Sequence, residues 1–200
     1  MGMREDGRSM SGAVAGGQDV AHERVAVAPA LELSLHLGDR RTGPEVWRAR
    51  MVPGDERAAS TVLAEATLHR VHYADPRWSD HLRRARTDLA EVGSAFADRE
   101  LISMIDESSL FTESLCVISS IDVAPAAVGS FVSHDLVRAV AGVFDGDTIA
   151  LVIPGAFVPE GGGPVESAGD IATRRAHWAS IGFVDIPGTR AMLLPVRVRP

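Results

Sequence analysis

Residues Ser114–Ser133 read SLCVISSIDVAPAAVGSFVS and carry the strongest structural signal in the chain. The first half, Leu115–Val123, is apolar and rich in β-branched residues, which predicts a strand. A proline and a Gly-Ser turn follow, and residues 130–144 then show a helical spacing. The apolar side chains of this helix share one face: Leu136, Val137, Val140 and Val143. The segment therefore predicts a strand, a turn and a helix, in that order.

The chain continues in the same alternation toward its C-terminus. Residues 148–153 form a second apolar run that predicts a strand, and residues 168–180 predict a helix. Ile181–Val184 and Ala191–Val198 predict a closing pair of strands. The runs at 115–118 and 149–153 lack alternation, as expected of strands that helices cover on both faces.

The N-terminal half gives weaker signals. Strict alternation in Leu31–Leu37 and again at Val46–Val52 predicts a β-hairpin. Helical spacing of apolar residues predicts one helix over Glu56–Val71 and a second over Ser79–Gly93. We expect Ala95–Ser109 to continue the helical layer.

Composition limits the classes of function. Two hundred residues suit one domain, which we place at residues 31–200 after a disordered Gly- and Ser-rich lead-in at residues 1–30. The net charge of −7 argues against nucleic-acid binding, because phosphate contacts need a positive face. No apolar run is long enough for a membrane span, and the N-terminus lacks a secretory pattern. A single cysteine, Cys116, fits a reducing cytoplasm.

The order of elements, together with Trp178 and the Gly182-Phe183 pair, resembles the acetyl-CoA-binding half of the GCN5-related N-acetyltransferases, the GNAT family. This resemblance covers roughly residues 31–198. It implies an α/β fold with a mixed, mostly antiparallel sheet and helices on both faces. It also implies acyl transfer from acetyl-CoA to an amine of a small molecule or a protein.

The resemblance further implies where acetyl-CoA would bind. In that family a strand pairs with the pantetheine arm, and N–H groups at the start of the next helix hold the pyrophosphate. The family turn carries a basic or amide residue where this chain has Val128, and a glycine where it has Phe131, so binding is expected to be weak or lost. The matching cofactor positions are Ile121, Asp122, Val123, Val128, Gly129, Ser130, Phe131, Val132 and Ser133.

Two features bear on catalysis. Many members of the family end the later helix with a tyrosine that protonates the departing thiolate, but Trp178 occupies that position and cannot act as an acid. The single tyrosine, Tyr73, lies in the early part of the chain. Glu113 and Asp122 are the carboxylates available as a general base, although a solvated role for each is the more frequent one.

Other groupings are weaker. His69, His72 and His81 lie near Asp75 and Asp80, but they complete no zinc pattern, so we predict no metal site. The residue types of a hydrolase triad are also present, without the Gly-x-Ser-x-Gly elbow that such enzymes use. Those residues are Ser119, Ser120, His134 and Asp135.

The sequence thus leaves three hypotheses open. The first is an acetyl-CoA-dependent N-acyltransferase with an unidentified amine acceptor. The second is a GNAT-like binding or interaction module that has lost acetyl-CoA chemistry. The third is a structural subunit of a homodimer. The altered turn favours the second and third, and the order of elements favours the first.

Overall fold

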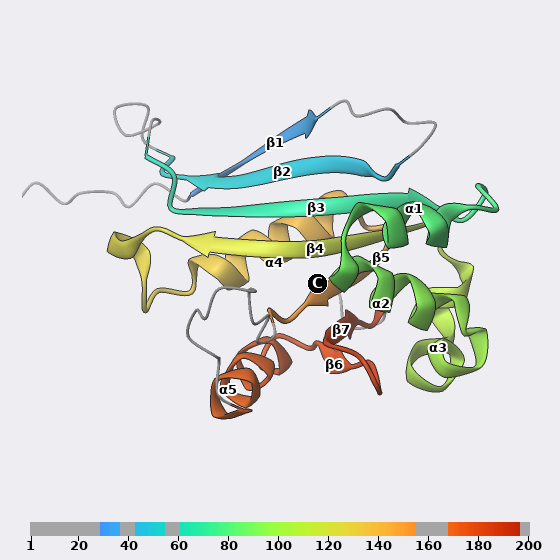
Figure 1. Ribbon diagram of the computed structural model, residues 1–200. Helices are drawn as coiled ribbons and strands as arrows, with labels where there is room; N and C mark the ends of the chain where they lie inside the picture. The colour runs from blue at the N-terminus through green and yellow to red at the C-terminus, as the bar shows by residue number, and fades with distance from the viewer. Residues whose placement is uncertain (1–28, 37–42, 55–60, 155–167, 197–200) are drawn as a thin grey trace, which may run out of the picture.

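The computed structural model describes residues 29–36, 43–54, 61–154 and 168–196. These residues build a seven-stranded sheet in the order β1-β2-β3-β4-β5-β7-β6 (Figure 1). Among the described pairs, β4 and β5 run parallel and the others run antiparallel. The strands are β1 Ala30–His36, β2 Glu45–Val52, β3 Ala64–His72, β4 Ser114–Val123, β5 Thr148–Val152, β6 Val184–Asp185 and β7 Ala191–Leu194.

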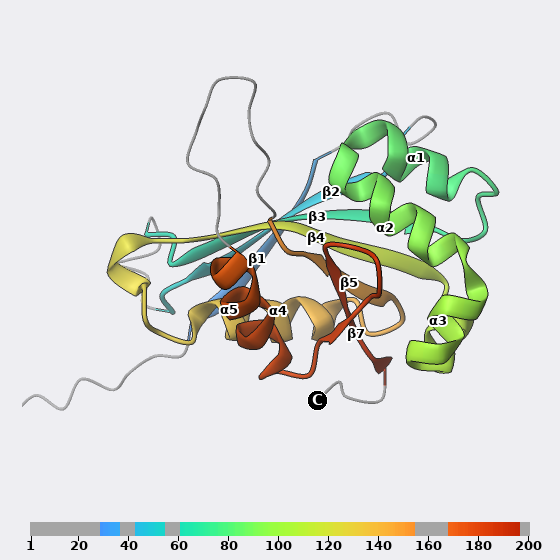
Figure 2. The ribbon, with the colours of Figure 1, turned by 60° about the horizontal axis from the view of Figure 1, so that its bottom comes forward.

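Helices cover both faces of the sheet. Figure 2 shows α1, α2 and α3 on one side and α4 and α5 on the other. Each face has its own buried apolar cluster: one packs beneath α1–α3, and the other beneath α4 and α5. The helices are α1 Trp78–Ala85, α2 Thr87–Ala97, α3 Arg99–Asp106, α4 Val132–Val143 and α5 Ala168–Ala179.

The central strand β4 explains why both layers are needed. Its side chains alternate, so Leu115 and Val117 belong to the α1–α3 cluster, while Cys116 and Ile118 belong to the α4–α5 cluster. All four are at most 1% exposed. The expected fold class is therefore confirmed: an α/β fold with a mixed, mostly antiparallel sheet and helices on both faces.

An ion pair links β3 to the residue that precedes β5. Arg70 of β3 reaches past β4 and donates hydrogen bonds from Nε and Nη2 to Asp147, at 2.6 and 3.0 Å. Asp147 is 3% exposed and directly precedes β5. This contact holds the loop between α4 and β5 against the N-terminal strands.

The helix predicted over Glu56–Val71 is wrong. Residues 61–63 belong to no helix or strand, and Ala64–His72 forms β3, a long strand that pairs with both β2 and β4. Residues 55–60 lie outside the described residues. The apolar spacing misled because β3 is covered on both faces and its burial does not alternate cleanly. Pairing with strands that are distant in the sequence therefore determines the structure of this segment.

The helix predicted over Ser79–Gly93 is two helices. The backbone of Arg86 is extended, with φ −159° and ψ 152°, which ends α1 and starts α2. The segment Ala95–Ser109 is also divided: α2 ends at Ala97, and α3 is followed by a 3-10 helix at Glu107–Phe111. Asp98 caps α3 by accepting hydrogen bonds from two backbone N–H groups.

The other predicted elements occur where expected. The hairpin is β1 with β2, and the predicted strand–helix–strand–helix series is β4, α4, β5 and α5. The closing strands are shorter than predicted, at Val184–Asp185 and Ala191–Leu194. Nearly all of the expected lead-in falls outside the described residues. None of the described helices has the length and apolarity that crossing a bilayer requires.

Candidate functional site

The strands β4 and β5 separate halfway along their length. They pair only over Leu115–Ile118 and Thr148–Leu151. Beyond this point β4 continues to Val123 and stays paired with β3, whereas β5 ends at Val152. Among the described residues, the β5-facing edge of residues 119–123 therefore has no strand neighbour. This edge can accept an extended ligand as an added strand.

A bulge accompanies the separation. Thr67 pairs with Ser120 and Leu68 pairs with Ile118, which leaves Ser119 as an extra residue in β4. A bulge bends its strand and increases the local twist. The bulge and the end of β4–β5 pairing coincide, so β4 turns away from β5 here and opens the sheet.

The opening leads into a cleft of about 550 Å³ on the α4–α5 face, which we call the α5 cleft. Ile121 and Val123 of β4 line it, together with Ser133 of α4. These are three of the positions that the sequence assigns to a cofactor. Side chains of α5 complete the wall: Thr173, Arg174, His177 and Trp178.

The start of α4 points unpaired N–H groups away from the helix. A 3-10 helix at Pro125–Ala127 leads into Gly129, whose φ of +86° favours glycine. Ser130 braces the turn by donating from Oγ to the carbonyl of Ala127 at 2.6 Å. The N–H groups of Phe131, Ser133 and His134 donate to no other described residue. With the helix macrodipole, this array suits an anion.

Val128 and Phe131 are each 72% exposed at this turn. The ring of Phe131 lies beside His134, and His134 stacks at 4.0 Å between centroids on His177 of α5. The buried position of His134 lowers its pKa, and the charge of His177 lowers it further. The hydroxyl of Ser133 also contacts Nε2 of His177 at 3.3 Å. An aromatic row thus joins the start of α4 to α5.

The two candidate bases lie apart from the α5 cleft. Glu113 is exposed just before β4, at the opposite end of that strand from the turn, and its carbonyl accepts the N–H of Tyr73. Asp122 is exposed and lies opposite Glu65 of β3. Neither carboxylate lines the α5 cleft. The remaining predicted cofactor positions lie in the turn at residues 128–132.

The α5 cleft contains tryptophan and no tyrosine. Trp178 is 8% exposed, packs edge-on against Phe183, and lines the cleft. Tyr73 lies on the opposite face, directly after β3, with its ring 5.1 Å from that of Trp78. Burial raises the pKa of Tyr73 to about 12. The only tyrosine in the sequence therefore cannot serve the α5 cleft.

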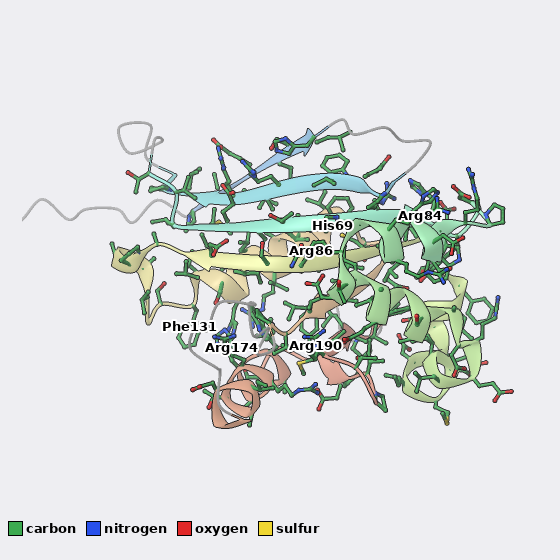
Figure 3. All side chains as sticks on the ribbon, viewed as in Figure 1. His69, Arg84, Arg86, Phe131, Arg174 and Arg190 are labelled. Carbon is green, nitrogen blue, oxygen red and sulfur yellow. The ribbon has the colours of Figure 1, made fainter. Side chains whose placement is uncertain are left out.

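A second cavity of about 560 Å³ lies at the start of α2, and we call it the α2 cavity. It shares Ser120, Val152 and Pro154 with the α5 cleft, so the two spaces meet where β4 and β5 separate. Arg86 lines it from the break between α1 and α2, and Arg190 from the start of β7. Figure 3 labels both arginines near the centre of the molecule, Arg86 beside β4 and Arg190 below it.

Sequence reasoning missed the α2 cavity. The spacing predicts a single helix over Ser79–Gly93 that contains Arg86, and Arg190 is separated from Arg86 by more than a hundred positions. The Arg86-Thr-Asp88 run was the available signal, since threonine and aspartate favour helix starts.

The weaker groupings do not assemble. His69 and His72 belong to a strand, His72 contacts Ser114, and His81 contacts Asp75 at 2.9 Å. Among the described residues, no three His, Cys, Asp or Glu side chains gather as for a metal ion. His134, one of the residue types of a hydrolase triad, is 5% exposed.

No family model and no curated protein matches the chain. Several solved structures are similar to it. A KacTA–DNA complex has a TM-score of 0.44 at 9% identity, covering 84% of this chain and 94% of that chain. AtaT complexed with acetyl-methionyl-tRNAfMet has a TM-score of 0.42 at 10% identity, covering 84% and 96%. Arylalkylamine N-acetyltransferase 2 from Aedes aegypti has a TM-score of 0.39 at 12% identity, covering 73% and 70%.

Proposed function

We propose that this protein is an acyl-CoA-dependent N-acyltransferase. The observation that carries the proposal is the separation of β4 from β5 at the bulged Ser119. Within the described part of the chain, it leaves residues 119–123 without a strand neighbour on the β5 side, and it joins two cavities that lie on opposite sides of the opening. A donor and an acceptor can meet there without sharing one pocket.

The residues fit an acyl-CoA donor in the α5 cleft. The edge of residues 119–123, which has no strand neighbour among the described residues, offers backbone N–H and C=O groups to the two amides of a pantetheine arm. The unpaired N–H groups at the start of α4 offer a site for the pyrophosphate. Arg174 adds a positive charge to the wall of the cleft. A bound donor supplies the acyl group as a thioester.

The acceptor amine would enter from the α2 cavity. Its nitrogen forms a bond to the acyl carbon, the carbon–sulfur bond breaks, and the proton lost by the amine passes to the departing thiolate. Trp178 lines the α5 cleft, and the described side chains there include no tyrosine that could act as the acid. Positioning of the amine against the thioester must therefore supply more of the rate enhancement. The positions of Glu113 and Asp122 do not support either residue as the general base, because neither lines the α5 cleft or the α2 cavity.

A binding module without acyl transfer is the second candidate. The observation in its favour is the exposed Val128, which stands where a basic or amide side chain would contact phosphate. Under either hypothesis we place the protein in the cytoplasm, where its buried Cys116 stays reduced.

Calorimetric titration with acetyl-CoA tests the proposal, together with thiol release in the presence of amines. We expect binding with a dissociation constant of ~0.1 mM. Thr173→Trp would fill the α5 cleft and abolish binding, since Thr173 lines the cleft from α5. Ala172→Trp, at the adjacent exposed position outside the lining, is the matched control. Wild-type protein that binds no acetyl-CoA, or a Thr173→Trp variant that binds normally, would refute it.

A further inference from the structure

The α2 cavity carries two guanidinium groups, and each is held in place by a carboxylate of α2. Arg86 donates from Nε and Nη2 to Asp88, at 3.1 and 2.6 Å. Arg190 donates from Nε and Nη2 to Glu91, at 3.2 and 2.5 Å. Two-point contacts of this kind fix the plane of an arginine side chain. Both guanidiniums are therefore oriented before any ligand arrives.

Each fixed guanidinium keeps its Nη1 group available. Nη1 of Arg86 makes only a long contact of 3.5 Å with Oγ of Ser119, the bulge residue. Nη1 of Arg190 donates to no other described residue. A guanidinium whose Nε and Nη2 groups are held by one carboxylate can still bind another anion through its Nη1 group. The bulge at Ser119 places the first of these groups next to the opening between β4 and β5.

The charges at the cavity are balanced in two ion pairs, Arg86 with Asp88 and Arg190 with Glu91. Arg86 and Arg190 line it with a single carboxylate, Asp88, whereas Glu91 lies outside the lining. His69 is buried nearby in β3, with both ring nitrogens lacking a hydrogen-bond partner. Burial, with a contribution from the charge of Arg86, lowers the pKa of His69 to about 4, so it adds no charge at neutral pH. The two ion pairs cancel in charge, so what the cavity offers an anionic ligand is the Nη1 donors of two oriented guanidiniums.

We infer that the acceptor is a primary amine that also carries a carboxylate, and that Arg86 and Arg190 bind this carboxylate. The inference rests on the proposed acyl transfer. The carboxylate would lie in the α2 cavity and the amine would point to Ser120, where the cavity meets the α5 cleft. Val152 and Ile153 add apolar surface for a side chain such as that of leucine.

The competing acceptor class is a polyamine, which Asp88 would attract. Asp88 is, however, already neutralised by Arg86 through two hydrogen bonds. A polyamine would have to displace that guanidinium, whereas a carboxylate uses an Nη1 group that the ion pair leaves available. The geometry therefore favours the carboxylate.

Acetylation of L-leucine is to be compared with that of L-leucinamide, which has the same shape without the negative charge. We expect kcat/KM to be at least tenfold higher for leucine. Arg86→Gln and Arg190→Gln should each raise KM for leucine about tenfold, as expected for a charge-assisted contact, and leave the amide little changed. Arg83→Gln removes an exposed arginine of α1 outside the cavity and is the matched control.

A binding measurement makes the inference independent of the donor. Protein without acetyl-CoA is titrated with N-acetyl-L-leucine and with N-acetyl-L-leucinamide, followed by NMR chemical shifts. We expect the acid to bind more tightly, and Arg86→Gln to remove the difference. Asp88→Asn should keep the preference for the acid. If acetyl-CoA fails to bind while this preference holds, the acyl-transfer proposal falls and the carboxylate site stands.

Three results would overturn the inference. The first is equal or tighter binding of the amide in the titration without donor. The second is acetylation of spermidine in preference to leucine, with Asp88→Asn weakening it. The third is an Arg86→Gln and Arg190→Gln double variant that remains folded by circular dichroism and acetylates leucine with unchanged KM.

Discussion

The ring of Phe131 lies beside the imidazole of His134, with 5.7 Å between the centroids and 34° between the planes. Both residues belong to the start of α4, where the resemblance places a phosphate group. Phe131 is 72% exposed, so its ring rests on the surface of the helix and fills no core space. The side chain can therefore be removed at little cost in stability, and its effect on ligand binding can be isolated.

We predict that the double change Val128→Arg, Phe131→Gly tightens acetyl-CoA binding about tenfold or more. Arginine adds a charge-assisted contact worth about 1.5–3 kcal/mol, and glycine opens the approach to the N–H groups of the turn. Calorimetric titration of both proteins measures the change. Circular dichroism checks that the variant is folded.

The control for this experiment adds the same charge at the other end of the helix. Val143→Arg changes an exposed residue of α4 that lies in its last turn, so it should leave the dissociation constant unchanged. A folded double variant that binds no more tightly than wild type would mean that the start of α4 does not hold the phosphates.

The C-terminal half could be predicted because its signals are local. The runs at 115–118 and 149–153 are apolar without interruption, and each is followed by a helix with one apolar face. The helix predicted over Glu56–Val71 failed because β3 is defined by its pairing with β2 and β4, which the spacing of its own residues does not contain.

The candidate site likewise has one part that the sequence could predict and one part that it could not. Ile121, Val123 and Ser133, which line the α5 cleft, could be grouped from the sequence because one strand–turn–helix segment carries all three. The α2 cavity could not be predicted, because Arg86 and Arg190 come together only through the tertiary fold. The bulge at Ser119 has no residue signature of its own, since it depends on the register between β3 and β4.

Val140→Asp should destabilise the protein by several kcal/mol. Val140 is fully buried in the cluster beneath α4 and α5, and the variant would place an unpaired carboxylate there. Urea denaturation measures the free energy of unfolding. Val143→Asp introduces the same residue at a position of α4 that is 56% exposed, and it should cost far less. Equal costs for the two variants would disprove the helical phase described above.

Cys116 should react slowly with a thiol reagent in native protein and rapidly in denaturant. The side chain is fully buried in β4 beneath the α4–α5 layer, and a thiol must reach solvent to react. Labelling with a chromogenic disulfide reagent, with and without urea, measures both rates. Fast labelling of the native protein would show that this part of the sheet opens easily.

The stability of the protein should fall as the pH drops below about 6.5, in part through His69. The folded pKa of His69 is about 4, below its usual 6.5, so between these values the unfolded chain binds a proton that the folded protein does not. Stability is therefore highest above 6.5 and decreases toward 4. His69 alone should cost about 1 kcal/mol between pH 7.5 and pH 5.5. Urea denaturation at the two pH values measures this loss.

Two variants separate His69 from other groups that titrate in this range. His69→Leu removes the titration and should reduce the pH dependence by about 1 kcal/mol; His134, whose pKa is also lowered, still contributes in the same direction. Burial is the main cause of the lowered pKa of His69 and the charge of Arg86 adds to it, so in Arg86→Gln the imidazole should titrate at a higher pH by NMR. Asp88, which acts in the opposite direction on His69, remains in both variants. If His69→Leu leaves the pH dependence of stability intact, the pKa of His69 does not differ between the folded and unfolded states, and the prediction is wrong.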